Sequence, residues 1–246
     1  MSSPRKQRLD QLLVERGLAP SRERAQALVL AGKVLVGDRV VDKAGQQVAA
    51  DADVRLREPD HPWVSRGGLK LAKAVETFAL AHEISDAVCA DIGASTGGFT
   101  DVLLSHGARR VFAVDVGQGQ LAWKLASDPR VVTVDKTNVR HLGKLAETPG
   151  FVTIDVSFIS LGLVLPKVAE LAPRARVVAL IKPQFEVGPA DVSKGGVVRD
   201  AAVRQAAVDR VVAAARAGGY TIDGVIESPI TGPAGNVEYL MVGRAP

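Results

Sequence analysis

The hydrophobic positions near the start of the chain follow two patterns. Helical spacing recurs in RLDQLLVERG (8–17) and in SRERAQALVLAG (21–32), and a glycine closes each segment. Alternating apolar residues follow in KVLVGDRVV (33–41), where Gly37 and Asp38 are a turn signal, and in DVRLRE (53–58). Residues 5–58 therefore predict two helices, a hairpin and a further strand.

The rest of the chain shows a different pattern. Two prolines and two glycines in EPDHPWVSRGG (58–68) predict a linker. Beyond it, short continuous apolar runs such as AVCADIG, RRVFAVDVG, FVTIDVS and RVVALIK alternate with helical segments such as DAAVRQAAVDRVVAAARAGG. Apolar strands separated by helices indicate an α/β fold with a mostly parallel sheet that is covered on both faces.

Composition narrows the class of protein. The chain has 246 residues and is 47% hydrophobic, which is enough for a large aliphatic core. It lacks an apolar run of about 18 residues, and MSSPRKQRLD lacks the apolar segment of a signal peptide, so we expect a cytoplasmic protein with no membrane association. Cys89 is the single cysteine, which excludes a disulfide framework and a thiolate metal site.

Positive charge is concentrated at the N-terminus. Residues 1–33 contain seven Lys and Arg against three Asp and Glu, an excess of four that equals the formal net charge of the whole chain, +4. Such a face favours a polyanion as partner, although a solvated basic surface is an equally good interpretation of the charge alone.

The segment DIGASTGGFT (91–100) lies between a predicted strand and a helix, where doubly wound proteins bind nucleotides. Its glycine spacing differs from the dinucleotide fingerprint G-x-G-x-x-G, and no Lys-Ser/Thr pair follows for a triphosphate. Asp91 would repel a pyrophosphate, but a carboxylate there can accept a hydrogen bond from an amine or a ribose.

Two further carboxylates end the next strands. Asp115 lies 22 residues after Gly93, where a carboxylate commonly takes ribose hydroxyls, and Asp135 ends the third strand. Carboxylates around a glycine turn, with no phosphate-binding group, suit S-adenosylmethionine, which carries a sulfonium and an ammonium. The alternative is a structural turn in which Gly97 and Gly98 only let the helix pack closely.

Four charged residues stand out in the predicted α/β part. Asp155 and Lys182 end apolar strands, Glu238 lies within the apolar run NVEYLMV, and Lys70 begins a helix. Strand ends of one parallel sheet converge, so we expect the four side chains to meet beside the cofactor. Such a set can hold a ribose hydroxyl and ease its deprotonation, because a lysine near other cations or removed from water can act as a base.

The N-terminal pattern resembles the S-four-type RNA-binding module, on the stretch RLDQLLVERGLAPSRERAQALVLAGKVLVGDRVV. The resemblance implies that Arg8, Arg22, Arg24 and Lys33 contact RNA phosphates. RLD also matches a triplet in which pseudouridine synthases use a catalytic Asp. We expect Asp10 instead to complement the dipole of the first helix.

The remainder is similar to the TlyA family on WVSRGGLKL, DIGASTGGFTDVLL, DVSFISL, IKPQFE and GNVEYL. Members of that family are ribosomal RNA 2′-O-methyltransferases, also named haemolysins, with an FtsJ-like catalytic domain that acts on cytidine ribose. The resemblance implies a Lys-Asp-Lys-Glu tetrad at Lys70, Asp155, Lys182 and Glu238. The predicted cofactor contacts are Asp91, Gly93, Ser95, Thr96, Gly97, Asp115 and Asp135.

The combined prediction is a small N-terminal α+β RNA-binding domain (1–60), a linker (61–67) and a methyltransferase domain (68–246). The latter is a doubly wound, mostly parallel, seven-stranded Rossmann-like sheet that binds S-adenosylmethionine. The expected partner is ribosomal RNA within a ribosomal subunit, with no obligate protein partner. The glycine-rich segment 186–198 is either a substrate lid or an inert loop.

Three other functions stay open at this point. Asp155-Val-Ser-Phe158 resembles the Asp/Asn-Pro-Pro-Tyr/Phe motif of base-amine methyltransferases, although both prolines are missing. The name haemolysin suggests a second function, that of a membrane-active toxin. The best candidate for a membrane-binding amphipathic helix is DAAVRQAAVDRVVAAARAGG. A noncatalytic RNA-binding protein is the third.

Overall fold

A computed structural model describes residues 6–57 and 61–246. The chain divides into two compact units, with the division between Pro62 and Trp63. Arg5, part of the linker stretch (58–60) and the predicted domain boundary at residue 60 lie outside the described residues.

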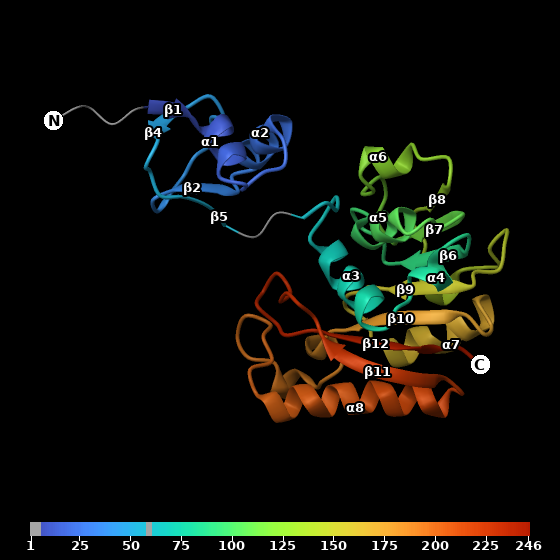
Figure 1. The fold of residues 1–246 in the computed structure, drawn as a ribbon. Coiled ribbons are helices and arrows are strands. Elements are labelled where there is room, and N and C mark those ends of the chain that lie inside the picture. Colours follow the sequence, from blue (N-terminus) through green and yellow to red (C-terminus); the bar gives the residue numbers. More distant parts are fainter. Residues whose placement is uncertain (1–5, 58–60) are drawn as a thin grey trace. The chain divides into compact units, whose positions relative to one another are not determined.

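The described residues of the N-terminal unit, 6–57 and 61–62, form two helices and five short strands, most of them labelled in Figure 1. In chain order these are β1 (Lys6–Arg8), α1 (Leu9–Glu15), α2 (Arg22–Leu30), β2 (Val34–Val36), β3 (Arg39–Val40), β4 (Gln47–Ala49) and β5 (Val54–Leu56). Strand β2 pairs antiparallel with β3 and β5, so the hairpin expected at Gly37 is confirmed. Pairing of β1 with β4 was not predicted, because each strand has only three residues.

Local chemistry explains the two helices of this unit. Ser21 caps α2 by accepting a hydrogen bond from the Arg24 amide, as its position before the apolar pattern predicts. The helices bury their apolar stripes in one core, formed mainly by Leu9, Leu12, Leu13, Ala25, Leu28, Val29, Val34, Val48 and Val54.

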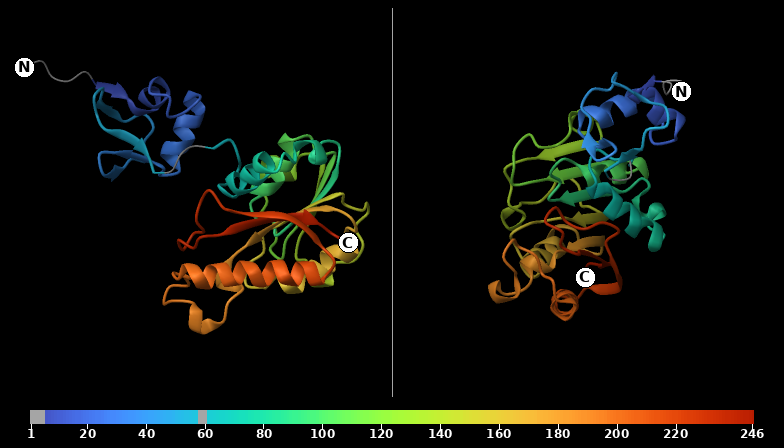
Figure 2. Two further views of the ribbon diagram at one scale, coloured as in Figure 1. Left: turned by 60° about the horizontal axis from the view of Figure 1, so that its bottom comes forward. Right: turned by 90° about the vertical axis from the view of Figure 1, so that its left-hand side faces the viewer.

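The second unit is built on a seven-stranded sheet in the order β11-β12-β10-β9-β6-β7-β8 (Figures 1 and 2). The strands are β6 (Val88–Ile92), β7 (Arg110–Val114), β8 (Val131–Val134), β9 (Phe151–Ile154), β10 (Arg176–Ile181), β11 (Thr221–Glu227) and β12 (Tyr239–Arg244). Strand β12 runs antiparallel to both of its neighbours, and the other pairs are parallel. The predicted doubly wound, mostly parallel sheet is confirmed.

Helices cover both faces of this sheet. They are α3 (Gly67–Thr77), α4 (Ala81–Ile84), α5 (Gly98–Ser105), α6 (Trp123–Ala126), α7 (Leu161–Leu171) and α8 (Ala201–Ala217), with the 3₁₀ turns η1 (Val139–His141), η2 (Pro183–Phe185) and η3 (Pro189–Asp191). Successive strand residues face opposite sides, so Cys89 packs with α3 and α5, whereas Ala90 packs with α7 and α8. The continuous apolar runs in the sequence reflect this two-sided burial.

Helix α8 is the amphipathic segment considered for membrane binding. Its buried residues Ala207, Val208, Val211 and Ala215 belong to the core on the α7 side of the sheet. Its apolar stripe is therefore satisfied by packing within the protein. No helix among residues 6–57 and 61–246 is long and apolar enough to cross a membrane.

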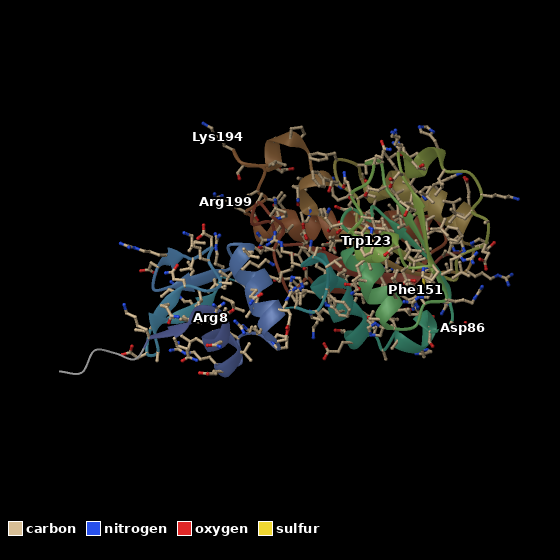
Figure 3. The ribbon with its side chains drawn as sticks, turned by 90° about the horizontal axis from the view of Figure 1, so that it is seen from above. Arg8, Asp86, Trp123, Phe151, Lys194 and Arg199 are labelled. Atoms are coloured by element: carbon tan, nitrogen blue, oxygen red, sulfur yellow. The ribbon has the colours of Figure 1, made fainter. Side chains whose placement is uncertain are left out.

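Two segments expected to be loops are more ordered than predicted. The end of the predicted linker belongs to the second unit, because Trp63 packs against Gly68 so closely that a Cβ there would lie 2.3 Å from the indole. Residues 193–197 form a small hairpin through the Ser193–Val197 bridge, and the Lys194 side chain projects outward (Figure 3). Buried Asn236 anchors this hairpin by bonding the Val198 amide and the Gly196 carbonyl.

Candidate active site

The site lies where the carboxyl ends of β6, β9 and β10 meet. Strand β12 runs antiparallel, so its amino end, just after Glu238, lies at the same edge. Two cavities open there, with volumes of about 510 and 840 Å³. They share Gly93, Asp155 and Ser157 among their lining residues, so a group bound in one can reach a group bound in the other.

The glycine turn brings β6 and β9 into close contact. Gly93 has a φ of +86°, and a Cβ there would lie 2.2 Å from the Asp155 carbonyl oxygen. Gly97 has a φ of +95° at the start of α5, where a Cβ would meet the Leu125 side chain at 2.3 Å. Both glycines are needed for the backbone path, and Gly97 does not line either cavity.

Asp91 is placed differently from the prediction. It is fully buried, and its carboxylate accepts hydrogen bonds from the hydroxyls of Thr100 (2.7 Å) and Thr153 (2.9 Å). Burial raises the pKa of Asp91 to about 6. The expected direct contact with the cofactor does not fit this geometry, because Asp91 instead ties β6 to α5 and β9.

Asp115 lines the larger cavity and holds its walls. Its carboxylate accepts hydrogen bonds from the amides of Ser95 (2.8 Å) and Gly117 (2.7 Å), which join the loops after β6 and β7. A carboxylate has further lone pairs, so Asp115 can also accept from a ribose hydroxyl. Asp135 accepts a hydrogen bond from the Gly119 amide at 2.8 Å and does not line the larger cavity. In this structure it therefore supports the loop after β7.

The larger cavity fits S-adenosylmethionine. Apolar side chains, among them Val116, Val139 and Leu163, provide a surface for an adenine ring, while Asp115 and Thr137 offer polar groups. Ser95 lines both cavities and Thr96 lines the smaller one; both side chains are exposed. Mixed apolar and polar walls of this size are typical of a nucleoside site.

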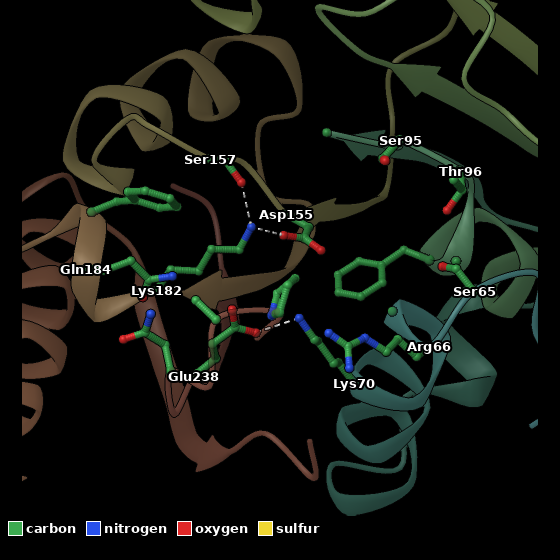
Figure 4. A pocket seen from close by; sticks show the side chains of 18 of the residues that line it. Ser65, Arg66, Lys70, Ser95, Thr96, Asp155, Ser157, Lys182, Gln184 and Glu238 are labelled. Atoms are coloured by element: carbon green, nitrogen blue, oxygen red, sulfur yellow. Dashed lines mark hydrogen bonds and ion pairs between the residues drawn. The ribbon is translucent and has the colours of Figure 1, made fainter. Parts of the chain in front are cut away.

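The smaller cavity contains all four residues of the predicted tetrad (Figure 4). Lys182 Nζ lies 2.6 Å from Asp155 Oδ1 and donates a hydrogen bond of 2.9 Å to Ser157 Oγ. Lys70 Nζ lies 2.5 Å from Glu238 Oε2. The structure thus brings together two ion pairs from segments that are far apart in the sequence.

Burial distinguishes the two pairs. The side chains of Lys70 and Glu238 are 8% and 1% exposed, whereas those of Lys182 and Asp155 are 12% and 22% exposed. Glu238 directly precedes β12, where the sequence pattern had placed it inside the strand. Each lysine is neutralised by a carboxylate at hydrogen-bond distance, which is the condition for keeping an ammonium in a partly dry cavity.

Sequence reasoning missed two residues that line the cavities and one buried residue that supports them. Ser157 holds Lys182, and Phe158, which is 91% exposed with a φ of +63°, forms part of the wall shared by the cavities. Glu186 is buried, and its carboxylate bonds the Ser160 hydroxyl and the Leu161 amide, so it ties the loop after β10 to the start of α7. The sequence signal that could have identified these residues is their position within a few residues of Asp155 or Lys182.

The predicted RNA-binding residues lie on the N-terminal unit. Arg8 and Arg22 both form ion pairs with Asp10, at 2.9 and 3.0 Å. Asp10 lies in the first turn of α1, as predicted from its place in the sequence, and its side chain is fully buried beneath the two arginines. Arg24 donates to the His61 carbonyl, and Lys33 precedes β2 and is half-buried.

Comparison with known proteins gives consistent matches for both units. The FtsJ-like methyltransferase family matches residues 63–245, and the S4 domain family matches residues 7–54. The chain is 46% identical to the 16S/23S rRNA (cytidine-2′-O)-methyltransferase TlyA of Mycobacterium tuberculosis, over 96% of this chain and 89% of the relative. It is 42% identical to Hemolysin A of Brachyspira hyodysenteriae, over 95% of this chain and 98% of the relative.

Solved structures agree with this assignment. A hemolysin from Streptococcus thermophilus superposes with a TM-score of 0.75 at 41% identity, covering 99% of this chain and 90% of the other. An S-adenosylmethionine-dependent methyltransferase from Listeria monocytogenes, with a TM-score of 0.51 and 14% identity over 74% of this chain and all of the other, shares the fold of the second unit. The chain therefore belongs to the TlyA family, and it combines an FtsJ-like, S-adenosylmethionine-dependent methyltransferase domain with an N-terminal S4 domain.

Proposed function

We propose that this protein methylates the 2′-hydroxyl of a cytidine ribose in ribosomal RNA, within a ribosomal subunit in the cytoplasm. The observation that carries the proposal is the pairing of Lys182 with Asp155 and of Lys70 with Glu238 in a cavity that adjoins the cofactor cavity. The Mycobacterium tuberculosis relative, a 16S/23S rRNA (cytidine-2′-O)-methyltransferase, supports the choice of substrate.

The four residues of the tetrad have different roles in the reaction of the ribose hydroxyl group. Bound S-adenosylmethionine supplies the methyl group on its sulfonium. Lys182 orients the ribose hydroxyl and stabilises the negative charge that develops on its oxygen, while Asp155 and Ser157 fix the direction of the ammonium. As the methyl group bonds to the ribose oxygen and S-adenosylhomocysteine leaves, the hydroxyl proton passes by way of Lys182 Nζ to Asp155 Oδ1, 2.6 Å away. Lys70, held by Glu238, assists from the other side of the cavity.

The geometry favours ribose over base-amine methylation. In amine chemistry the acidic residue must be free to accept hydrogen bonds from the exocyclic amine. Here Asp155 Oδ1 is 2.6 Å from an ammonium, and Ser157 occupies the place of a motif proline and contacts the same lysine. The site is thus equipped for a hydroxyl acceptor.

Mass spectrometry of ribosomal RNA, digested so that ribose and base methylation are separated, tests the proposal. Cells that produce the wild-type protein should gain 2′-O-methylcytidine, and cells that produce Lys182→Ala should lose it, because removing a preorganised charge-stabilising group costs on the order of 10²-fold or more in rate.

Lys144→Ala is a suitable control for that experiment. Lys144 is an exposed lysine that lines neither cavity, so its removal should leave the modification unchanged. A methylated base in place of a methylated ribose, or normal turnover by Lys182→Ala, would refute the proposal.

A further inference from the structure

The N-terminal unit contains a buried carboxylate beneath its basic surface. The Asp10 side chain is fully buried, yet its oxygens accept hydrogen bonds from Arg8 Nε and Nη2, Arg22 Nε, Gln26 Nε2 and the Gln11 amide, all between 2.9 and 3.0 Å. The hydrogen bonds from Arg8 are the main reason why the pKa of Asp10 lies well below its usual range. Asp10 is therefore a permanent anion in this unit.

A buried anion needs an explanation beyond helix stability. Taking a carboxylate out of water is costly even when it is paired, and an exposed acid in the first turn of α1 would serve the helix dipole at lower cost. What the burial achieves is orientation: one carboxylate fixes two arginines that come from β1 and α2, fourteen positions apart.

The two arginines remain accessible from outside. Their side chains are 38% and 49% exposed, and both line one open cavity of about 590 Å³ together with Lys6 and Gln47. The Arg8 guanidinium (Figure 3) also lies over Gly45, where a Cβ would be 3.2 Å from its terminal nitrogens. Among residues 6–57 and 61–246, no hydrogen bond from the terminal nitrogens of Arg22 is found, so these donors can bind an acceptor on a ligand.

We propose that Asp10 is a positioning residue, which holds Arg8 and Arg22 as a preformed pair of phosphate-binding side chains for the RNA backbone. The identity of the RNA rests on the proposed function. Arginine presents a planar fork that matches phosphate, and fixing the fork before binding avoids the entropy cost of ordering each side chain when RNA binds. Loss of Asp10 should therefore weaken RNA binding through the arginines.

The direction in which RNA affinity changes on substitution of Asp10 distinguishes a positioning role from a purely electrostatic one. Asp10→Asn removes a negative charge from a basic surface, so an electrostatic field alone predicts tighter binding to RNA. Positioning predicts the opposite, a rise in Kd of at least about fivefold. Asp51→Asn is the matched control, because Asp51 is an exposed carboxylate of the same unit that does not line this cavity, and the variant makes the same charge change. It should bind RNA as tightly as the wild-type protein, or more tightly.

The measurement is fluorescence anisotropy of a labelled ribosomal RNA fragment with the full-length protein variants, each checked for thermal unfolding. Weaker binding by Asp10→Asn alone supports the inference. Equal or tighter binding by that variant, or equal weakening by both variants, would overturn it. Because binding is measured without methyl transfer, a failure of the proposed reaction would appear separately, as wild-type protein that binds the fragment and leaves its ribose unmodified.

Arg22→Lys covers the case in which Asp10→Asn does not fold. This variant keeps the positive charge and Asp10 but removes the Nε donor that Asp10 holds. We expect Kd to rise at least about threefold at unchanged thermal stability, because lysine is a flexible point charge. Wild-type affinity in Arg22→Lys would contradict the role of the pair.

Discussion

Each lysine of the smaller cavity is paired with its own carboxylate, and the two pairs differ in their access to water. Glu238 is almost completely buried with Lys70, whereas Asp155 is more open to the cavity. Loss of a carboxylate leaves an unpaired ammonium, and the energetic cost of that charge grows with burial.

We therefore expect Glu238→Gln to lower the free energy of unfolding of the second unit by about 3 kcal/mol. Asp155→Asn should cost clearly less, because water can reach Lys182. Both variants should lose methyl transfer. Urea denaturation followed by circular dichroism measures the difference, and a larger loss of stability in Asp155→Asn would contradict the ranking.

Asp91 makes the stability of the protein depend on pH. Its pKa rises from 3.8 in the unfolded chain to about 6 in the folded protein, mainly through burial. A raised carboxyl pKa gives a contribution to stability that is fully present below about pH 4 and is lost as pH rises through about 6. Ionisation of Asp91 thus opposes folding at neutral pH.

Asp91→Asn should remove this loss. Relative to the wild-type protein, the variant should gain on the order of 1–3 kcal/mol of stability between about pH 4 and pH 7. Burial also raises the pKa of Glu186, but that group is present in both proteins and cancels. Unfolding free energies at several pH values test this, with exposed Asp86→Asn as control; parallel pH profiles would refute it.

At the scale of elements, the β6–α5 turn and the end of strand β9 are held together by direct contacts. Gly93 touches the backbone of Asp155, Asp115 holds the Ser95 amide, and Asp91 joins Thr100 to Thr153. The turn that lines the larger cavity therefore also fixes the position of the Asp155 backbone beside the smaller cavity.

Gly93→Ala should disturb both cavities together. The new Cβ would overlap the Asp155 carbonyl at a φ of +86°, so the backbone must shift, at a cost of about 1–3 kcal/mol. We expect weaker S-adenosylmethionine binding in calorimetry and strongly reduced methyl transfer. Gly143→Ala, which has no neighbouring atom within 4 Å, should change neither; wild-type cofactor affinity in Gly93→Ala would show that the contact is unimportant.

At the scale of the whole molecule, the two units contain different sets of chemical groups. The N-terminal unit presents arginines and no tetrad residue, and the second unit contains both cavities that meet at Asp155. Substitutions in one unit should therefore affect RNA binding, and substitutions in the other should affect methyl transfer.

Salt dependence tests this division. Arg22→Ala should flatten the slope of log affinity for RNA against log salt by about one unit, because one phosphate contact is lost. Lys182→Ala should keep the wild-type slope while losing turnover. An unchanged slope in Arg22→Ala would mean that this arginine does not bind phosphate.

The sequence by itself determined the α/β class, the extra N-terminal unit and the residue types of the tetrad. Apolar runs and helical spacing report local burial, which backbone geometry converts directly into strands and helices. Strand ends of a parallel sheet converge, so the positions of Asp155 and Lys182 at the ends of two apolar runs were enough to predict that they meet.

Only the tertiary structure decided which charged groups line a cavity and which are buried and bonded within the protein. The sequence predicted a cofactor contact for Asp91 and a helix-dipole role for Asp10. Folding buries both carboxylates, and their oxygens accept hydrogen bonds from Thr100 and Thr153, and from Arg8 and Arg22, respectively. Partner choice depends on contacts between residues that are distant along the chain. Local patterns carry no information on such contacts, because the three-dimensional packing of the elements selects them.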